Sequence, residues 1–252
     1  MEGFLELTNI NINSSFYEEI KKYALKRPAQ EVCGFVILND FGEVEIKPCE
    51  NIYPDKTNGF KIQTKVFLDS LKKDVLAIYH SHPFHSSDPS SHDLAQSQEL
   101  CTPFVIYSVK YDNFYIHIPK SVPIKPFAQR QYVDGLQNCI VLVADFYKKK
   151  HKFDSDGFNF YLERKRPTWE FTFDTMVSSK NLFRDNGFKK VEKAKMKKND
   201  LIVFQIKKNE VHFGVCLDND KFLHHPFYGF SQESFFNEQI KNSIHSVYRK
   251  SV

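Results

Sequence analysis

The stretch from Val75 to Asp93, VLAIYHSHPFHSSDPSSHD, places a cluster of metal-binding side chains directly after an apolar run. The run that ends at His80 is suited to a buried strand. Residues two apart on a strand point to the same face, so the imidazoles of His80 and His82 can reach one metal ion. Asp93 follows eleven residues after His82, in the first turn of a helix predicted to start after Pro89, and can add a carboxylate oxygen.

Two histidines and one aspartate form a donor set typical of a catalytic zinc site. Such a set leaves the fourth position of a tetrahedral Zn²⁺ open for water. Glu31 is a candidate general base for that water, and Ser90 is a candidate stabiliser of the oxyanion. Two alternatives stay open. A His-x-His pattern by itself more often consists of ordinary surface or packing histidines. Ser90-x-x-Asp93 also predicts a helix-capping box, which can coexist with a catalytic role.

The signature of the JAMM (MPN+) metalloproteases resembles three strings of this sequence: Glu31-Val32-Cys33-Gly34, His80-x-His82-Pro83 and Ser90-x-x-Asp93. Every signature position is filled, and the resemblance covers roughly residues 5–118. By that resemblance, the zinc ligands are His80, His82 and Asp93, the general base is Glu31, and the residue that polarises the substrate carbonyl is Ser90.

The elements predicted around this cluster make a mixed α/β sandwich in which strands carry most of the core. Helical spacing of apolar residues covers 16–25, and a second helix starts after Pro89 and covers 90–100. Strand patterns cover residues 31–38, 43–48, 75–80, 104–108 and 114–118.

A proline-containing segment near mid-chain predicts a linker between two domains. It coincides with a change in charge: residues 1–120 carry 12 Lys and Arg against 16 Asp and Glu, whereas residues 121–252 carry 23 against 15. We therefore predict domains at 1–118 and 130–252 with a linker at 119–129. The basic second half is compatible with an anionic partner or with an ordinary lysine-rich surface.

The second half predicts an α+β arrangement, with helices first and a strand meander afterwards. Asn138 is a plausible N-cap for a helix from Cys139 to about 149. A second helix at 174–186 is closed by Gly187. Three strand-like runs follow at 201–207, 210–217 and 221–224.

Cys139 and two histidines form the second candidate site. The start of a helix predicts a lowered thiol pKa for Cys139, because the helix dipole and free N–H groups stabilise a thiolate. His212 and His224 lie on consecutive predicted strands, and a hairpin would set them side by side. A nucleophile, a base and an orienting group make a catalytic triad. The alternative is that Cys139 is a packing residue, as lone cysteines on apolar helical faces usually are.

The surrounding strings are similar to the NlpC/P60 family over roughly residues 130–250. Asn138-Cys139-x-x-Leu142-Val143 resembles the nucleophile segment, and His212-x-Gly214-Val215 and Phe222-Leu223-His224-His225 resemble the strands of the other two triad residues. The resemblance implies a papain-like fold that cleaves stem peptides of bacterial peptidoglycan. Asn138 replaces the Asp usual in that family, and the bulky Ile140 and Val141 follow the nucleophile, so we expect a narrower substrate cleft beside Cys139.

Cysteine usage and hydropathy narrow the setting. The five cysteines are scattered, with no CxxC pair, which argues against a disulfide framework. The longest apolar stretch, 140–144, is too short to span a membrane. The first ten residues lack the positive charge of a secretory signal, so we expect synthesis in a reducing cytosol.

The order of the two domains resembles a family of tail-assembly proteins of long-tailed phages, of the lambda protein K type. That resemblance implies a protein of the virion tail tip, assembled in the host cytoplasm, with other tail-tip proteins and peptidoglycan as partners. Three readings compete: both sites active, a structural tail-assembly factor with one or both sites inactive, or a cellular ubiquitin-type isopeptidase. The wall-peptidase partner domain argues against the third, and no nucleic-acid motif accompanies the positive charge.

Overall fold

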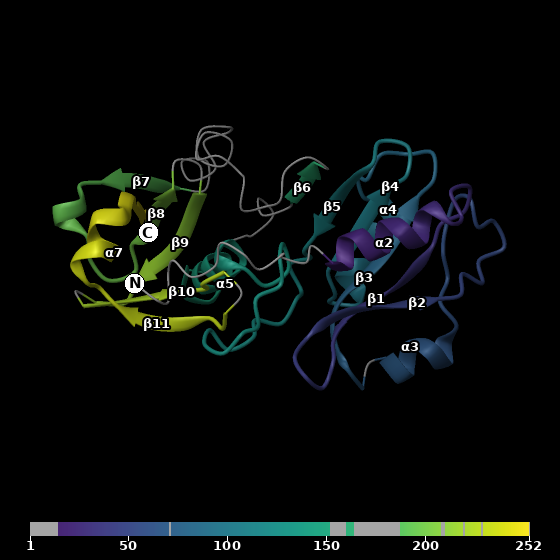
Figure 1. Ribbon diagram of the computed structural model, residues 1–252, viewed down its shortest axis with the longest axis horizontal. Helices are drawn as coiled ribbons and strands as arrows, with labels where there is room; N and C mark the ends of the chain where they lie inside the picture. Colours follow the sequence, from purple (N-terminus) through teal and green to yellow (C-terminus); the bar gives the residue numbers. More distant parts are fainter. Residues whose placement is uncertain are drawn as a thin grey trace. The chain divides into compact units, whose positions relative to one another are not determined.

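The computed structural model describes residues 15–70, 72–151, 160–163, 187–207, 210–218, 220–227 and 229–251. The chain forms two compact units, one reaching to Pro123 and one starting at Ile124. A short segment around residues 160–163 also belongs to the first unit, although it follows the first helix of the second unit in the sequence. Each unit is built on a six-stranded sheet (Figure 1).

The first unit contains the expected helices and strands, one further helix, α3, and one further strand, β6. Its elements are α2 (Ser15–Leu25), β1 (Cys33–Leu38), β2 (Val44–Cys49), α3 (Thr64–Ser70), β3 (Asp74–His82), α4 (Ser91–Glu99), β4 (Phe104–Ser108), β5 (Asn113–His117) and β6 (Phe160–Glu163). The strand order is β2-β1-β3-β4-β5-β6, and β3 and β4 are the parallel pair.

Helices cover both faces of this sheet. On one face, α2 packs through Tyr17 against Phe114 of β5, with 5.1 Å between ring centroids. On the other face, Val66 and Phe67 of α3 pack against a core cluster. That cluster consists of Cys33, Phe35, Ile37, Cys49, Ile78, Phe104 and Ile106. The apolar alternation of β1, β3 and β4 thus fills both layers of the predicted sandwich.

The second unit has one long helix followed by strands. Its elements are α5 (Cys139–His151), β7 (Phe188–Val191), the short 3₁₀ helix η3 (Lys193–Lys195), β8 (Leu201–Lys207), β9 (Glu210–Cys216), β10 (Lys221–His224), β11 (Gln232–Phe235), α7 (Glu238–Ser243) and β12 (Ile244–Lys250). The sheet order is β11-β10-β9-β8-β12-β7, with each adjacent pair antiparallel. Helix α5 packs against β9 and β10.

The fold class agrees with the sequence prediction: a mixed α/β sandwich comes first and an α+β unit second. The helix predicted at 174–186 lies outside the described residues. Across the part of the chain that the structure describes, no helix combines the length and the apolar character needed to cross a membrane.

Candidate functional site

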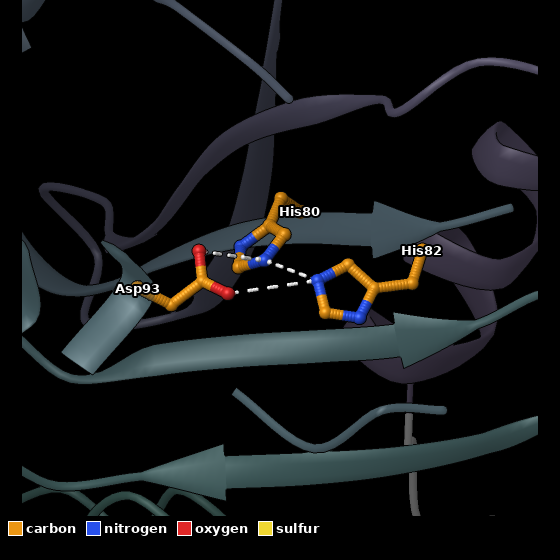
Figure 2. A group of neighbouring side chains, drawn as sticks. All are labelled: His80, His82 and Asp93. Atoms are coloured by element: carbon orange, nitrogen blue, oxygen red, sulfur yellow. Dashed lines mark hydrogen bonds and ion pairs between the residues drawn. The ribbon is translucent and has the colours of Figure 1, made fainter. Parts of the chain in front are cut away.

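His80, His82 and Asp93 meet at one point in the first unit (Figure 2). Nε2 of His80 lies 3.1 Å from Nε2 of His82. The carboxylate of Asp93 approaches both rings, with Oδ1 3.3 Å from His80 Nε2 and Oδ2 3.6 Å from His82 Nε2. Among the described residues, these three form the one group of His, Cys, Asp and Glu whose donor atoms could share a metal ion.

The size of this triangle fits a tetrahedral ion. Donors at about 2.0–2.1 Å from a tetrahedral zinc lie roughly 3.3 Å from one another. The separations of 3.1, 3.3 and 3.6 Å therefore match one face of such a tetrahedron. Two imidazole nitrogens and one carboxylate oxygen are also ligands that Zn²⁺ prefers, so the donor set fits the metal that the sequence predicts.

Strand register and a helix cap bring the ligands together. His80 and His82 lie two apart at the end of β3, so their side chains share a face of the sheet. Asp93 is the third residue after Ser90, the N-cap of α4, and the two form the predicted capping box. Ser90 Oγ accepts from the Asp93 backbone N–H at 3.1 Å and donates to Asp93 Oδ2 at 2.6 Å. The hydroxyl of Ser90 thus holds the carboxylate of a candidate ligand.

Each candidate histidine ligand is held from outside the cluster. Nδ1 of His82 lies 2.6 Å from the backbone carbonyl of Ser86, which makes Nδ1 the protonated nitrogen of the neutral ring, and the neutral ring then has its lone pair on Nε2. The ring of Phe60 stacks on His80, with centroids 4.7 Å apart and an interplanar angle of 23°. A hydrogen bond in one case and a stacked ring in the other fix the two imidazole planes.

Glu31 lines the same cavity as the cluster. The cavity has a volume of about 400 Å³. Its walls include Glu31, Tyr53, Phe60, His82, His85, Asp88, Ser90, His92 and Asp93. Burial raises the pKa of Glu31 to about 8; the nearby His82 opposes this shift, and the Asp93 carboxylate adds to it. A carboxylate with this pKa can accept a proton near neutral pH.

The ligand side chains also have shifted pKa values. Burial alone would raise the pKa of Asp93, but hydrogen bonds with His80 and His82 outweigh it and hold the pKa well below its usual value. Burial lowers the pKa of His80, against the effect of Asp93. Burial would also lower the pKa of His82, but hydrogen bonds with Asp93 and with the Ser86 carbonyl raise it instead. The cluster therefore favours a charged carboxylate.

Cys139 begins helix α5 in the second unit, as predicted. Asn138 caps this helix, because its Oδ1 accepts the backbone N–H of Val141 at 3.1 Å. The prediction of a lowered thiol pKa is wrong for this conformation. Cys139 is 7% exposed, and burial raises its pKa to about 12, although backbone N–H groups such as that of Phe213 oppose the shift. Desolvation outweighs the helix terminus here.

The two histidines of the second site are in contact. Nε2 of His212 on β9 lies 3.0 Å from Nδ1 of His224 on β10, and both residues are buried. Gly214 stands opposite His224 in the sheet, and a Cβ there would lie 2.9 Å from the Leu223 carbonyl oxygen, so glycine suits the close approach of β9 and β10 at this point. The sulfur of Cys139 lies within reach of the Phe213 backbone N–H, beside His212.

Some site neighbours carry no sequence signal. His224 Nε2 lies 2.9 Å from Ser234 Oγ on β11, and the Ser86 carbonyl is a backbone group that any residue would supply. His225, which follows β10, is fully buried, and its ring lies edge-on to Tyr132 with 5.5 Å between ring centroids. A fully buried imidazole follows from packing against distant segments, which a local pattern does not reveal.

Two family models match the chain, one on each half. Residues 13–119 match the model described as prokaryotic homologs of the JAB domain, and residues 139–249 match the NlpC/P60 family. The first half of the chain is thus similar to JAB-type domains and the second half to NlpC/P60 domains. Both domains indicate the hydrolase class, and their order agrees with the resemblance to phage proteins of the protein K type.

One curated relative matches the chain across both halves. The tail tip assembly protein K of Escherichia phage N15 is 25% identical over 223 residues, which cover 85% of this chain and 86% of that protein. A solved protein from Desulfitobacterium hafniense is 20% identical, with a TM-score of 0.33 over 40% of this chain and 79% of its own. An NlpC/P60 family protein from Bacillus cereus is 11% identical, with a TM-score of 0.30 over 90% of this chain and 66% of its own.

Proposed function

We propose that the chain is a phage tail-tip assembly protein with two hydrolytic sites. The first is a zinc-dependent, isopeptidase-type site, and the second is a Cys-His-His endopeptidase site that cleaves stem peptides of bacterial peptidoglycan. The observation that carries the hydrolase proposal is the triangle of donor atoms in the first unit, whose size matches a zinc tetrahedron. The match to tail tip assembly protein K supports the virion tail tip as location and other tail-tip proteins as partners.

In the zinc site, His80, His82 and Asp93 would hold the metal. A bound zinc ion supplies Lewis acidity toward a water molecule and a substrate carbonyl. Glu31 lines the same cavity and would take the proton from that water and later pass it to the leaving amine. Ser90 holds Asp93 through its hydroxyl, so its proposed action on the substrate oxygen requires that hydroxyl to turn from Asp93.

In the cysteine site, Cys139 would attack the carbonyl carbon of a peptide bond. The thiol proton passes to His212 as the carbon–sulfur bond forms, and the leaving amine receives that proton as the carbon–nitrogen bond breaks. Water then hydrolyses the thioester. His224 contacts His212 at 3.0 Å and would fix the orientation of the base.

The burial of Cys139 favours a second candidate function for the second unit, that of a structural assembly domain with a silent site. A thiol with a pKa of about 12 is a weak nucleophile at neutral pH. Catalysis then depends on His212 taking the proton during attack. The two candidates differ in whether a change at Cys139 affects cleavage.

Cys139→Ala in the full chain is expected to reduce stem-peptide cleavage by about a thousandfold or more, because the nucleophile is lost. Mass analysis of peptidoglycan fragments incubated with the protein measures this. Cys101→Ala is the matched control, since Cys101 is exposed, and it should cleave at the wild-type rate. Equal cleavage by wild type and Cys139→Ala, or none by either, would leave the structural function standing.

The zinc site is tested by metal content. We expect about one zinc per wild-type chain and less than about a tenth of that in His82→Ala, because a ligand is lost from a three-ligand site. His92→Ala is the control, because His92 lines the cavity outside the donor triangle and should leave the metal content unchanged. A wild-type protein that binds no zinc after incubation with the metal would contradict the assignment.

A further inference from the structure

A line of hydrogen-bonding side chains runs from the buried part of the cysteine site to the face of β11. His212 Nε2 lies 3.0 Å from His224 Nδ1, and His224 Nε2 lies 2.9 Å from Ser234 Oγ. In the pairing of β10 with β11, Ser234 stands opposite Phe222, diagonal to His224 on the same face of the sheet. The two imidazoles are 1% and 2% exposed, whereas Ser234 is half-buried.

The direction of these hydrogen bonds decides whether His212 can act as a base. A neutral imidazole carries one ring proton, so one nitrogen donates and the other accepts. If His224 donates from Nε2 to Ser234, its Nδ1 accepts from His212 Nε2–H, and Nδ1 of His212 keeps a lone pair. If the Ser234 hydroxyl donates instead, His224 donates from Nδ1 and His212 must carry its proton on Nδ1. In that second arrangement Nδ1 of His212 is already protonated and cannot accept a proton.

The structure allows the first arrangement, in which His224 donates from Nε2 to Ser234. Both imidazoles are neutral at neutral pH, because burial and then the neighbouring histidines lower the pKa of His212, and burial and then His225 lower that of His224 to about 4. Burial also lowers the pKa of His225 to about 4, so this neighbour adds no positive charge at neutral pH. The half-buried Ser234 can donate its hydrogen to water and still accept from His224.

The charged state of His212 makes a stronger demand. Once His212 has taken a proton, both of its ring nitrogens are donors, and His224 Nδ1 must accept. The proton of His224 is then on Nε2, and a side-chain acceptor for it is Ser234 Oγ, 2.9 Å away. An acceptor at this position therefore stabilises the imidazolium that forms during attack by the thiol.

We propose that Ser234 is a positioning residue of the cysteine site: it accepts the Nε2–H of His224 and so keeps Nδ1 of His212 unprotonated, in the state that can take the proton of Cys139. This inference rests on the proposed roles of Cys139 and His212. Ser234 acts through His224 and does not touch the substrate. Ser234 thereby becomes a fourth residue of the site and determines which ring nitrogens of His212 and His224 carry protons.

The proposal is tested on the full chain with Ser234→Ala and Ser234→Thr. Thr keeps the hydroxyl and suits a strand, and Glu233→Ala, on the neighbouring exposed position of β11, is the control. Nitrogen NMR of the imidazoles reports which ring nitrogen carries the proton. Alkylation of Cys139, followed by mass spectrometry of its own peptide as a function of pH, reports the thiol reactivity separately from the other four cysteines.

In the wild type we expect His224 protonated at Nε2. Ser234→Ala should shift that proton toward Nδ1 and slow Cys139 alkylation at neutral pH by roughly 10- to 100-fold, while Ser234→Thr and Glu233→Ala stay near wild type. A wild-type His224 protonated at Nδ1, or a Ser234→Ala protein with unchanged tautomer and alkylation, would overturn the proposal. If the tautomer and reactivity follow Ser234 but Cys139→Ala still cleaves stem peptides, the proton order stands and the proposed peptidase function fails.

Discussion

The two candidate sites respond differently to the same physical effect, the loss of water around a titratable side chain. In the first unit, the site opens on a cavity of about 400 Å³, and burial raises the pKa of Glu31 to about 8, which suits a general base. In the second unit, Cys139, His212 and His224 are 7%, 1% and 2% exposed. Burial there keeps a thiol protonated and two imidazoles neutral. Desolvation thus gives Glu31 a pKa suited to a general base, whereas it keeps Cys139 in the less nucleophilic thiol form.

Metal removal should separate the two units most clearly. A ligand that binds the folded state stabilises it by about 4 kcal/mol when its concentration is a thousandfold above Kd. Chelation of zinc is therefore expected to lower the free energy of unfolding of the first unit by roughly that amount and to leave the second unchanged. Hydrogen exchange in peptides from β3 and β9 measures the two units separately. Equal loss of protection in both peptides would remove the distinction.

The pH dependence of stability should have opposite signs in the two units. In the zinc-free protein, the folded pKa of Glu31, about 8, lies above its usual value of 4.5, so folding is favoured at low pH and stability is lost as pH rises from 4.5 to 8. The folded pKa of His224, about 4, lies below its usual 6.5, so stability is lost as pH falls from 6.5 to 4. The full changes are about 5 and about 3 kcal/mol.

Two neutral substitutions isolate these contributions. Relative to wild type, Glu31→Gln should become more stable as pH rises, and His224→Gln should lose less stability as pH falls, because neither amide titrates. Denaturant unfolding of each unit, monitored by hydrogen exchange over this pH range, measures the stability of both units. Parallel pH curves for wild type and either variant would show that the buried group does not carry the effect.

A smaller effect is expected at the N-cap of α4. Ser90→Ala removes the acceptor for the Asp93 N–H and the donor to its carboxylate, so it should cost about 1 kcal/mol of stability and weaken zinc binding by roughly 10-fold. Ser90→Thr keeps the hydroxyl and should recover most of both. Thermal unfolding and zinc titration measure the two quantities. A stability loss with unchanged zinc affinity would limit Ser90 to capping.

Local patterns predicted the parts of the sites that depend on neighbouring residues in the sequence. The spacing of His80 and His82 on a strand and the capping string from Ser90 to Asp93 led directly to the observed cluster. The hairpin between β9 and β10 placed His212 beside His224 as expected. In each case one strand register or one helix turn sets the distance.

Features set by packing between distant segments were not predictable in this way. The thiol pKa of Cys139 depends on strands more than sixty residues away, so the helix-terminus argument gave the wrong direction. Helix α3 and strand β11 are short, and the β11 string QESF is largely exposed and lacks a buried alternation. Ser234 therefore had no pattern around it that pointed to His224.

Strand β6 has a consequence for how the protein can be divided. Residues 160–163 pair with β5 in the first unit, while α5 before them and β7 after them belong to the second. A gene cut near residue 130 would deprive the first fragment of that strand and leave the backbone groups of β5 open to pairing with other chains. Its product is expected to aggregate. The two halves are thus best studied by point substitution in one polypeptide.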